Sequence, residues 1–177
     1  MNTKKYIEEA LLDILKKKSI DKIKVSEIIK KVGTCKGTFY KYYCDKYALL
    51  QACFKNLFYS KIVSEAPDWE TFIFKCLETF EKIPNVILNA FISEDINSIR
   101  YYHEKILITY LEAEMEKQSA ILKCKINSVS LRLCISSYTE IILNWLRSGM
   151  KESKEDVIGF MRAAMPQSIY TKIYVTA

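Results

Sequence analysis

The chain has 177 residues and a formal net charge of +6, and it contains only 4 glycines and 3 prolines. This length is enough to bury a core, in one domain or in a small domain plus a larger one. No apolar run reaches the length of about 18 residues that a membrane span needs. The charged, amphipathic N-terminus does not resemble a signal peptide. We therefore expect a cytoplasmic protein without a membrane partner.

The residue types that enzymes and metal sites use are sparse in this chain. The six cysteines form no CxxC pair, which argues against zinc and redox motifs. His103 is the one histidine, and the acids beside it are scattered, so the metal signal is weak. The sequence contains no nucleophile elbow and no Gly-rich phosphate loop. We therefore predict no enzyme activity, no catalytic residue, no metal and no cofactor.

Helical periodicity begins near the N-terminus. Apolar residues predict a helix at 3–18, followed by a short amphipathic helix at 25–32 and another at 36–42. Gly33 supplies the turn between the two short helices, as in a helix-turn-helix. Asp45 has the character of an N-cap for a long helix from Lys46 to about Glu65, which Pro67 closes.

The segment 36–42 combines polar and aromatic side chains with two lysines, which suits a DNA groove better than a core. Residues 1–60 contain 13 lysines, no arginine and 6 acidic residues, so the positive charge of the chain is concentrated there. Localised positive charge favours a polyanionic partner. Any single lysine is also explained by solvation of a helix face.

Several signals in this stretch are in register with one family. They are Thr38-Phe39-Tyr40, Tyr43 at the place of a usual Phe, and Asp45-Lys46 followed by Leu49-Leu50. Together they resemble the TetR family of bacterial helix-turn-helix transcriptional regulators. The resemblance implies an all-α fold, with a three-helix DNA-binding head at 1–45 and a helical body for regulation, ligand binding and dimerisation at 46–177.

The resemblance also implies a function and partners. We expect a ligand-responsive homodimeric repressor that binds a palindromic double-stranded DNA operator and answers to an unidentified small-molecule effector. The alternatives are a TetR-like activator or co-regulator controlled by a protein partner, and a helical binding protein that does not bind DNA. The residues predicted to contact DNA are Lys24, Ser26, Lys36, Gly37, Thr38, Tyr40, Lys41, Tyr42 and Lys46.

Within this set the roles differ. Lys36 and Thr38 would reach base edges from the first turn, whereas Lys46 would pair with a phosphate at a helix N-terminus. Phe39 and Tyr43 are expected in the core. The sequence departs from the family at Lys24, where a Thr N-cap is common, and at Cys35, where a Ser is common. Ser26 or Thr34 could supply the missing caps. For Cys35 and Cys44, inert small residues are favoured over a redox sensor.

The body shows helical patterns at about 69–82, 85–92, 98–118, 124–149 and 154–165. The segment 124–149 carries two apolar stripes, which implies burial on both sides. One stripe contains Ile126, Val129, Leu133, Cys134 and Ile141. The other is assigned, with the last helix, to a dimer interface, whose predicted residues are Leu131, Ile135, Tyr138, Ile142, Trp145, Phe160 and Met161. A helix central to a monomeric core is the alternative.

Aromatic residues gather after Pro67. A small-molecule pocket is predicted at Phe72, Phe91, Tyr102, His103 and Tyr110, although a plain packed core explains these residues nearly as well. The tail at 167–177 alternates apolar and polar residues. It is interpreted as an extended segment on the body, with partial disorder as the alternative.

Overall fold

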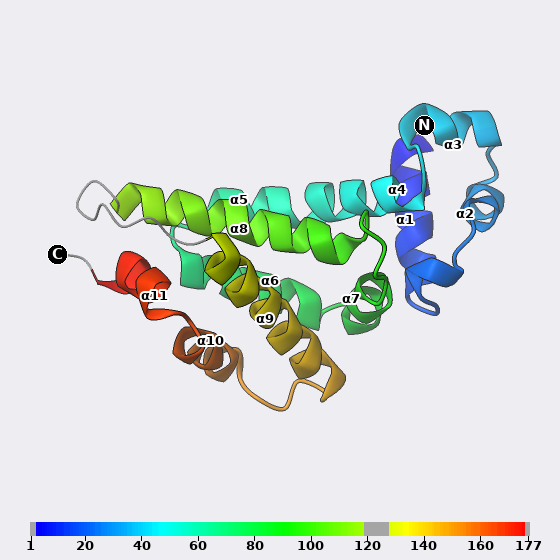
Figure 1. Cartoon of the computed structure of the whole chain (residues 1–177). Coiled ribbons are helices and arrows are strands. Elements are labelled where there is room, and N and C mark those ends of the chain that lie inside the picture. Colours follow the sequence, from blue (N-terminus) through cyan, green and yellow to red (C-terminus); the bar gives the residue numbers. More distant parts are fainter. Residues whose placement is uncertain (1–2, 119–127, 176–177) are drawn as a thin grey trace. The chain divides into compact units, whose positions relative to one another are not determined.

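The computed structural model describes residues 3–118 and 128–175, and its regular structure is entirely helical, so the predicted all-α class is confirmed. Figure 1 shows the helices in chain order. They are α1 (Thr3–Leu15), α2 (Val25–Val32), α3 (Lys36–Tyr42), α4 (Lys46–Phe54), α5 (Ser60–Glu65), α6 (Trp69–Glu81), α7 (Pro84–Phe91), α8 (Ile99–Gln118), α9 (Ser128–Arg147), α10 (Lys154–Ala163) and α11 (Gln167–Tyr174). A 3₁₀ turn (η1, Ile20–Lys22) precedes α2, and a π-helical turn (η2, Lys55–Tyr59) joins α4 to α5.

The expected helices agree closely with these bounds, and α2 and α3 agree residue for residue. The expected start of the 124–149 helix, including Ile126, lies outside the described residues. The interpretation of the tail was wrong, because residues 167–174 form α11 with Ile169 buried. Tyr170 and Tyr174 are four residues apart, so a helix brings their rings together, with centroids 4.8 Å apart.

The chain forms two compact units. The first comprises Met1–Lys61 and Lys82–Tyr102. In this unit α1 packs against α2, α4 and α7, and α2 packs against α3 (Figure 1). Leu11, Leu15 and Ile28 are fully buried at these contacts. The unit therefore continues past residue 45, and the functional division at 45/46 stays a prediction.

The second unit comprises Ile62–Glu81 and His103–Ala177. Here α10 packs against both α6 and α9. The Tyr138 hydroxyl on α9 donates a 2.7 Å hydrogen bond to the carbonyl of Met161 on α10. Ion pairs fasten α10 to α6 as well, since Lys154 lies 2.7 Å from Glu81. The core of this unit is thus shared by helices far apart in sequence.

Candidate nucleic-acid interface

The turn between α2 and α3 is fixed by the backbone of Gly33. This residue has φ 71° and ψ 33°, a left-handed conformation that glycine adopts without steric cost. Its N–H donates to the carbonyls of Ile29 and Lys30, at 3.0 and 3.3 Å, and the N–H of Thr34 also donates to Ile29, at 3.2 Å. These bonds satisfy the carbonyls at the end of α2. The sequence therefore sets the helix-turn-helix locally.

Helix α3 has one buried face and one exposed face. Phe39 is fully buried and Tyr43, at the C-cap, is 5% exposed, as predicted. Tyr40 and Tyr42 are 54% and 41% exposed. Lys36, Gly37 and Lys41 are exposed too, and Thr38 is half-buried. The outer face of α3 thus offers cations, hydroxyls and aromatic rings, which are the groups that contact phosphates and base edges.

A buried carboxylate holds the end of α3. The Tyr43 hydroxyl donates to Oε1 of Glu8 on α1 at 2.6 Å, and the Asn56 amide donates to the same oxygen at 3.4 Å. Burial and the hydrogen bond to Glu8 raise the pKa of Tyr43 above its ordinary value, so its phenol remains a neutral donor. Sequence reasoning missed Glu8. The signal was available, because Glu8 lies next to Ile7 in the apolar stripe of the first helix.

The start of α2 is capped by a residue outside the predicted set. Glu27 accepts a 3.2 Å hydrogen bond from the backbone N–H of Lys24 and pairs with Lys18 at 2.7 Å. The Lys18 hydrogen bond is the main reason why the pKa of Glu27 is lowered. Lys24 and Ser26 are exposed, so both side chains are accessible to DNA.

The N-cap prediction for α4 is confirmed, since Asp45 accepts a 2.7 Å hydrogen bond from the N–H of Ala48. The neighbouring Lys46 departs from its expected role. Its ammonium donates to three carbonyl oxygens of the turn at 20–23, at 2.8, 3.0 and 3.2 Å. All three N–H donors of the ammonium therefore have acceptors within the protein. A direct phosphate contact would require Lys46 to give up these bonds.

The residues predicted for a small-molecule pocket belong to both units. In the second unit, Phe72 stacks on Tyr110 with ring centroids 4.2 Å apart, and the Tyr110 hydroxyl donates to the carbonyl of Ala66 at 2.8 Å. His103 is fully buried, and burial lowers its pKa to about 3. In the first unit, Phe91 packs on Phe54 at 5.9 Å.

Tyr102, also in the first unit, packs on Tyr59 at 6.2 Å. The five predicted residues thus fill space by contact with neighbouring rings and backbone. Their role in ligand binding stays a prediction.

Most of the residues predicted for the dimer interface are not available at the surface of the second unit. The structure buries most members of the predicted stripe within this unit, namely Leu131, Ile135, Tyr138, Ile142, Trp145 and Met161. The physical reason is that α9 presents this stripe to its own core, where the rings of Tyr138 and Trp69 lie 6.0 Å apart. In the other stripe, Val129 and Leu133 are 59% and 65% exposed, whereas Cys134 is buried. Phe160 on α10 is 55% exposed.

Two family models match this chain and together cover the head and most of the body. The model described as "Bacterial regulatory proteins, tetR family" matches residues 7–53, and the one described as "Transcriptional regulator C-terminal region" matches residues 67–167. The chain belongs to the TetR family. It is a transcriptional regulator with a helix-turn-helix DNA-binding region.

Individual relatives agree with this assignment. An uncharacterized HTH-type transcriptional regulator, YvdT of Bacillus subtilis (strain 168), is 43% identical over 51 residues, which are 29% of this chain and 26% of that protein. The fatty acid degradation regulator FadR from Bacillus halodurans has a TM-score of 0.63 at 18% identity, over 94% of this chain and 96% of that one.

The dihydroxyacetone kinase operon activator DhaS has a TM-score of 0.60 at 18% identity, over 93% of this chain and 96% of that one. At such low identity these two likenesses establish the fold. The family and these neighbours are transcription regulators, not enzymes. Across the part of the chain that the structure describes, no helix is long and apolar enough to cross a membrane.

Proposed function

We propose that this TetR-family regulator is a cytoplasmic, homodimeric repressor that binds a palindromic operator and is released by a small-molecule effector. The observation that carries the DNA-binding role is the division of α3 into two faces. Phe39 is buried while Tyr40 and Tyr42 are exposed, and Lys36 and Lys41 are exposed on the same short helix. A helix anchored in this way can enter a major groove without exposing apolar core.

Different side chains of α3 are proposed to contact base edges and phosphates. Lys36 and Thr38 lie on the first turn, from which recognition helices reach base edges. Tyr40, Lys41 and Tyr42 follow and supply hydroxyls and a cation for phosphates. Lys24 and Ser26 add contacts from the start of α2. Lys46 acts differently from the other lysines, because it stabilises the turn at 20–23 from within.

The experiment for this role is a gel shift with DNA from upstream of the protein's own gene, over a series of salt concentrations. Lys41→Ala should weaken binding to all sequences and reduce the salt slope by about 1. Lys151→Ala is the matched control, because Lys151 is exposed in the second unit. An equal effect of both variants, or no salt-sensitive complex with the wild type, would contradict the proposal.

The dimer is proposed to form through the exposed apolar side chains of α9 and α10. These are Val129, Leu133 and Phe160. Two copies related by a two-fold axis would place their recognition helices in successive major grooves, about 34–36 Å apart. Leu133→Glu combined with Phe160→Glu should give folded monomers with weakened operator binding. Ile96→Glu is the control, since Ile96 is 81% exposed in the first unit. A monomeric wild type in sedimentation at micromolar concentration would exclude this interface.

Control by a protein partner is the second candidate, and one observation favours it. Phe72 and Tyr110, predicted to line an effector pocket, stack on each other instead. A thermal-shift screen of small molecules, followed by operator binding with each hit, separates the two. Hits that weaken operator binding support the effector. Hits that stabilise the protein but leave operator affinity unchanged favour an activator or co-regulator controlled by a protein.

A further inference from the structure

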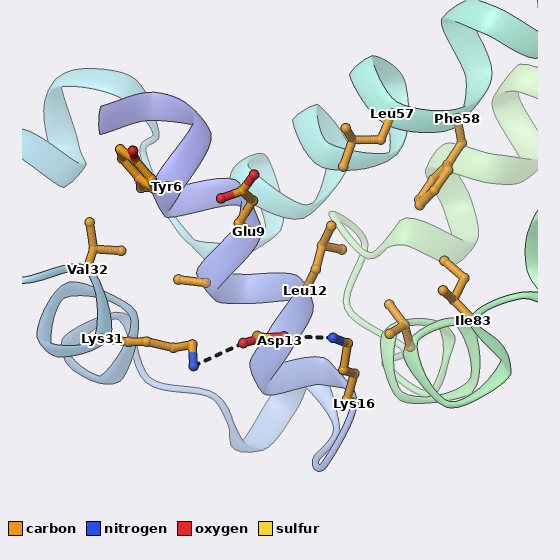
Figure 2. Close-up of a pocket in the computed structure, with 12 residues that line it drawn as sticks. Tyr6, Glu9, Leu12, Asp13, Lys16, Lys31, Val32, Leu57, Phe58 and Ile83 are labelled. Carbon is orange, nitrogen blue, oxygen red and sulfur yellow. Dashed lines mark hydrogen bonds and ion pairs between the residues drawn. The ribbon is translucent and has the colours of Figure 1, made fainter. Parts of the chain in front are cut away.

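The first unit contains a hollow of ≈ 900 Å³ that no residue of α3 lines. This volume is in the range of about 300–1,000 Å³ that ligand pockets occupy. The hollow lies among α1, the last turn of α2, the π-turn and the start of α7 (Figure 2). Its apolar wall comprises Ala10, Leu12, Leu57, Phe58, Ile83 and Val86.

The wall leaves apolar surface open to solvent. Leu57 is 46% exposed, and Tyr6 at the other side of the hollow is 47% exposed. In Figure 2, Leu57 and Phe58 point from the π-turn (η2) toward Leu12 and Ile83. A ligand here would remove this apolar surface from water, which is the main favourable contribution to binding of a small apolar group.

The π-turn is a second, independent feature of the same place. The hydroxyl of Ser60 donates to the carbonyl of Lys55 at 2.7 Å, and the backbone N–H of Ser60 bonds to the same carbonyl. Such turns are rare within helices and occur frequently at functional sites. This one lets Tyr59 be buried on Phe54, with ring centroids 6.1 Å apart, while Leu57 and Phe58 border the hollow.

One end of the hollow is basic. A smaller hollow of ≈ 400 Å³ shares Asp13, Lys16 and Lys31 with the first and adds Lys17 and Lys18. Asp13 pairs with Lys16 at 2.7 Å and with Lys31 at 3.1 Å (Figure 2).

Lys18 forms an ion pair with Glu27 at 2.7 Å. Glu27 itself lines neither hollow. The lining contains two carboxylates, Asp13 and Glu9. Asp13 is the one that pairs with Lys16 and Lys31, whereas Glu9 pairs with Lys5 at 3.8 Å. This end carries excess positive charge next to an apolar wall.

We propose that the two hollows together form a binding site for an amphipathic anion. Its apolar body lies against Leu12, Leu57 and Phe58. Its single carboxylate, sulfonate or phosphate group is held by Lys16, Lys17 and Lys31. Charge-assisted hydrogen bonds from lysine to such a group are stronger than neutral ones. None of the five residues predicted for an effector pocket lines either hollow, so this site goes beyond the proposed function.

The test uses the full chain and two probes, 8-anilinonaphthalene-1-sulfonate and dodecanoate below its micellar concentration. The sulfonate should show saturable fluorescence with one site per chain, and dodecanoate should displace it. Dodecanol, which has the same chain without the charge, should compete at least about tenfold more weakly. Absence of saturable binding, or equal competition by dodecanol, would overturn the proposal.

Variants locate the site. Leu57→Lys places a charge in the apolar wall and should weaken both probes at least about tenfold. Lys16→Ala with Lys31→Ala should remove the preference for dodecanoate over dodecanol. The controls are Ile92→Lys, 59% exposed outside the lining, and Lys22→Ala. Cooperative thermal unfolding of each variant shows that it is folded. Equal losses in variants and controls would place the probe elsewhere and overturn the assignment.

A second arm separates this site from the regulatory role. The hollow touches Val32, which directly precedes the Gly33 turn to α3, so we infer that occupancy changes operator affinity; this step rests on the proposed function. Operator binding is measured with and without dodecanoate in wild type and Leu57→Lys. Probe binding with unchanged operator affinity would refute the coupling and keep the site. Failure of every operator assay with intact probe binding would refute the proposed function alone.

Discussion

The hydroxyl of Tyr43 donates a 2.6 Å hydrogen bond to the carboxylate of Glu8, which lies 35 residues earlier in the chain. Both side chains are buried, at 5% and 7% exposure. The bond joins the first helix to the residue that ends the recognition helix. It therefore links the orientation of the DNA-facing side chains to α1, which contributes no residue to the predicted DNA surface.

Tyr43→Phe should destabilise the protein by about 1–3 kcal/mol, because it leaves a buried carboxylate without its shortest hydrogen bond. Operator affinity should fall as well, since the end of α3 is less constrained. Thermal unfolding and gel shifts measure the two effects. Tyr42→Phe is the matched control, because Tyr42 is 41% exposed, and its stability should stay within about 0.5 kcal/mol of wild type. Equal stability of the two variants would show that the Glu8 bond contributes nothing.

Lys46→Met should lower stability, whereas Lys41→Met should not. The Lys46 ammonium donates to three carbonyls at 2.8–3.2 Å, and its removal leaves those carbonyls to water. Lys41 is exposed on α3. Denaturant unfolding measures the stability of both variants, and the salt dependence of DNA binding is read in parallel. A reduced salt slope for Lys46→Met without loss of stability would restore the phosphate contact expected from the sequence.

Stability should fall with decreasing pH below about 6.5 through His103. Its pKa is about 3 in the folded protein and near 6.5 in the unfolded chain. Between these values the unfolded state binds a proton that the folded state excludes, so acid favours unfolding, by at most about 1.4 kcal/mol per pH unit. His103→Leu removes the one histidine of the chain. The unfolding free energy of the wild type minus that of the variant should rise with pH and level off above pH 7. A difference that does not vary with pH would contradict the burial of a neutral imidazole.

Gly33→Ala should cost about 1 kcal/mol of stability through backbone strain alone. Gly33 has φ 71°, and an added Cβ meets no atom within 4 Å. The penalty is therefore conformational and not a clash. Gly33→Asn should cost less, because asparagine tolerates the left-handed region better than alanine. Chemical unfolding of both variants tests this order, and a larger loss for asparagine would show that side-chain volume matters at this turn.

Local rules made the head predictable. Asp45 caps the helix that follows it, and Gly33 ends the helix that precedes it, and both depend on a few neighbouring residues. The roles of Lys46 and Glu8 depend on contacts with residues at least 23 positions away, which spacing along one helix does not reveal. For Lys46 the local pattern suggested a phosphate contact, and for Glu8 it suggested no role.

In the second unit, the sequence did not reveal which face of α9 packs against the core. Two apolar stripes on the 128–147 helix were visible in the sequence, but not which of them faces the core. The stripe that contains Tyr138 faces the core, because the Tyr138 ring packs on Trp69 and its hydroxyl donates a hydrogen bond to the Met161 carbonyl. Leu133 belongs to the other stripe and is 65% exposed. An apolar pattern marks a face that can be buried, and the packing partners show whether the core of the chain buries it.

The turn at Lys55–Tyr59 has a consequence for comparing this chain with its relatives. In an uninterrupted α-helix, residues five apart are rotated by about 140°, so Phe54 and Tyr59 would face different sides. The wider turn brings both into one core. It is equivalent to one inserted residue, and deleting Asn56 would return the helix to ordinary geometry with both buried faces kept in phase. Relatives one residue shorter here would share the same fold, and an alignment gap within 55–58 would record the insertion.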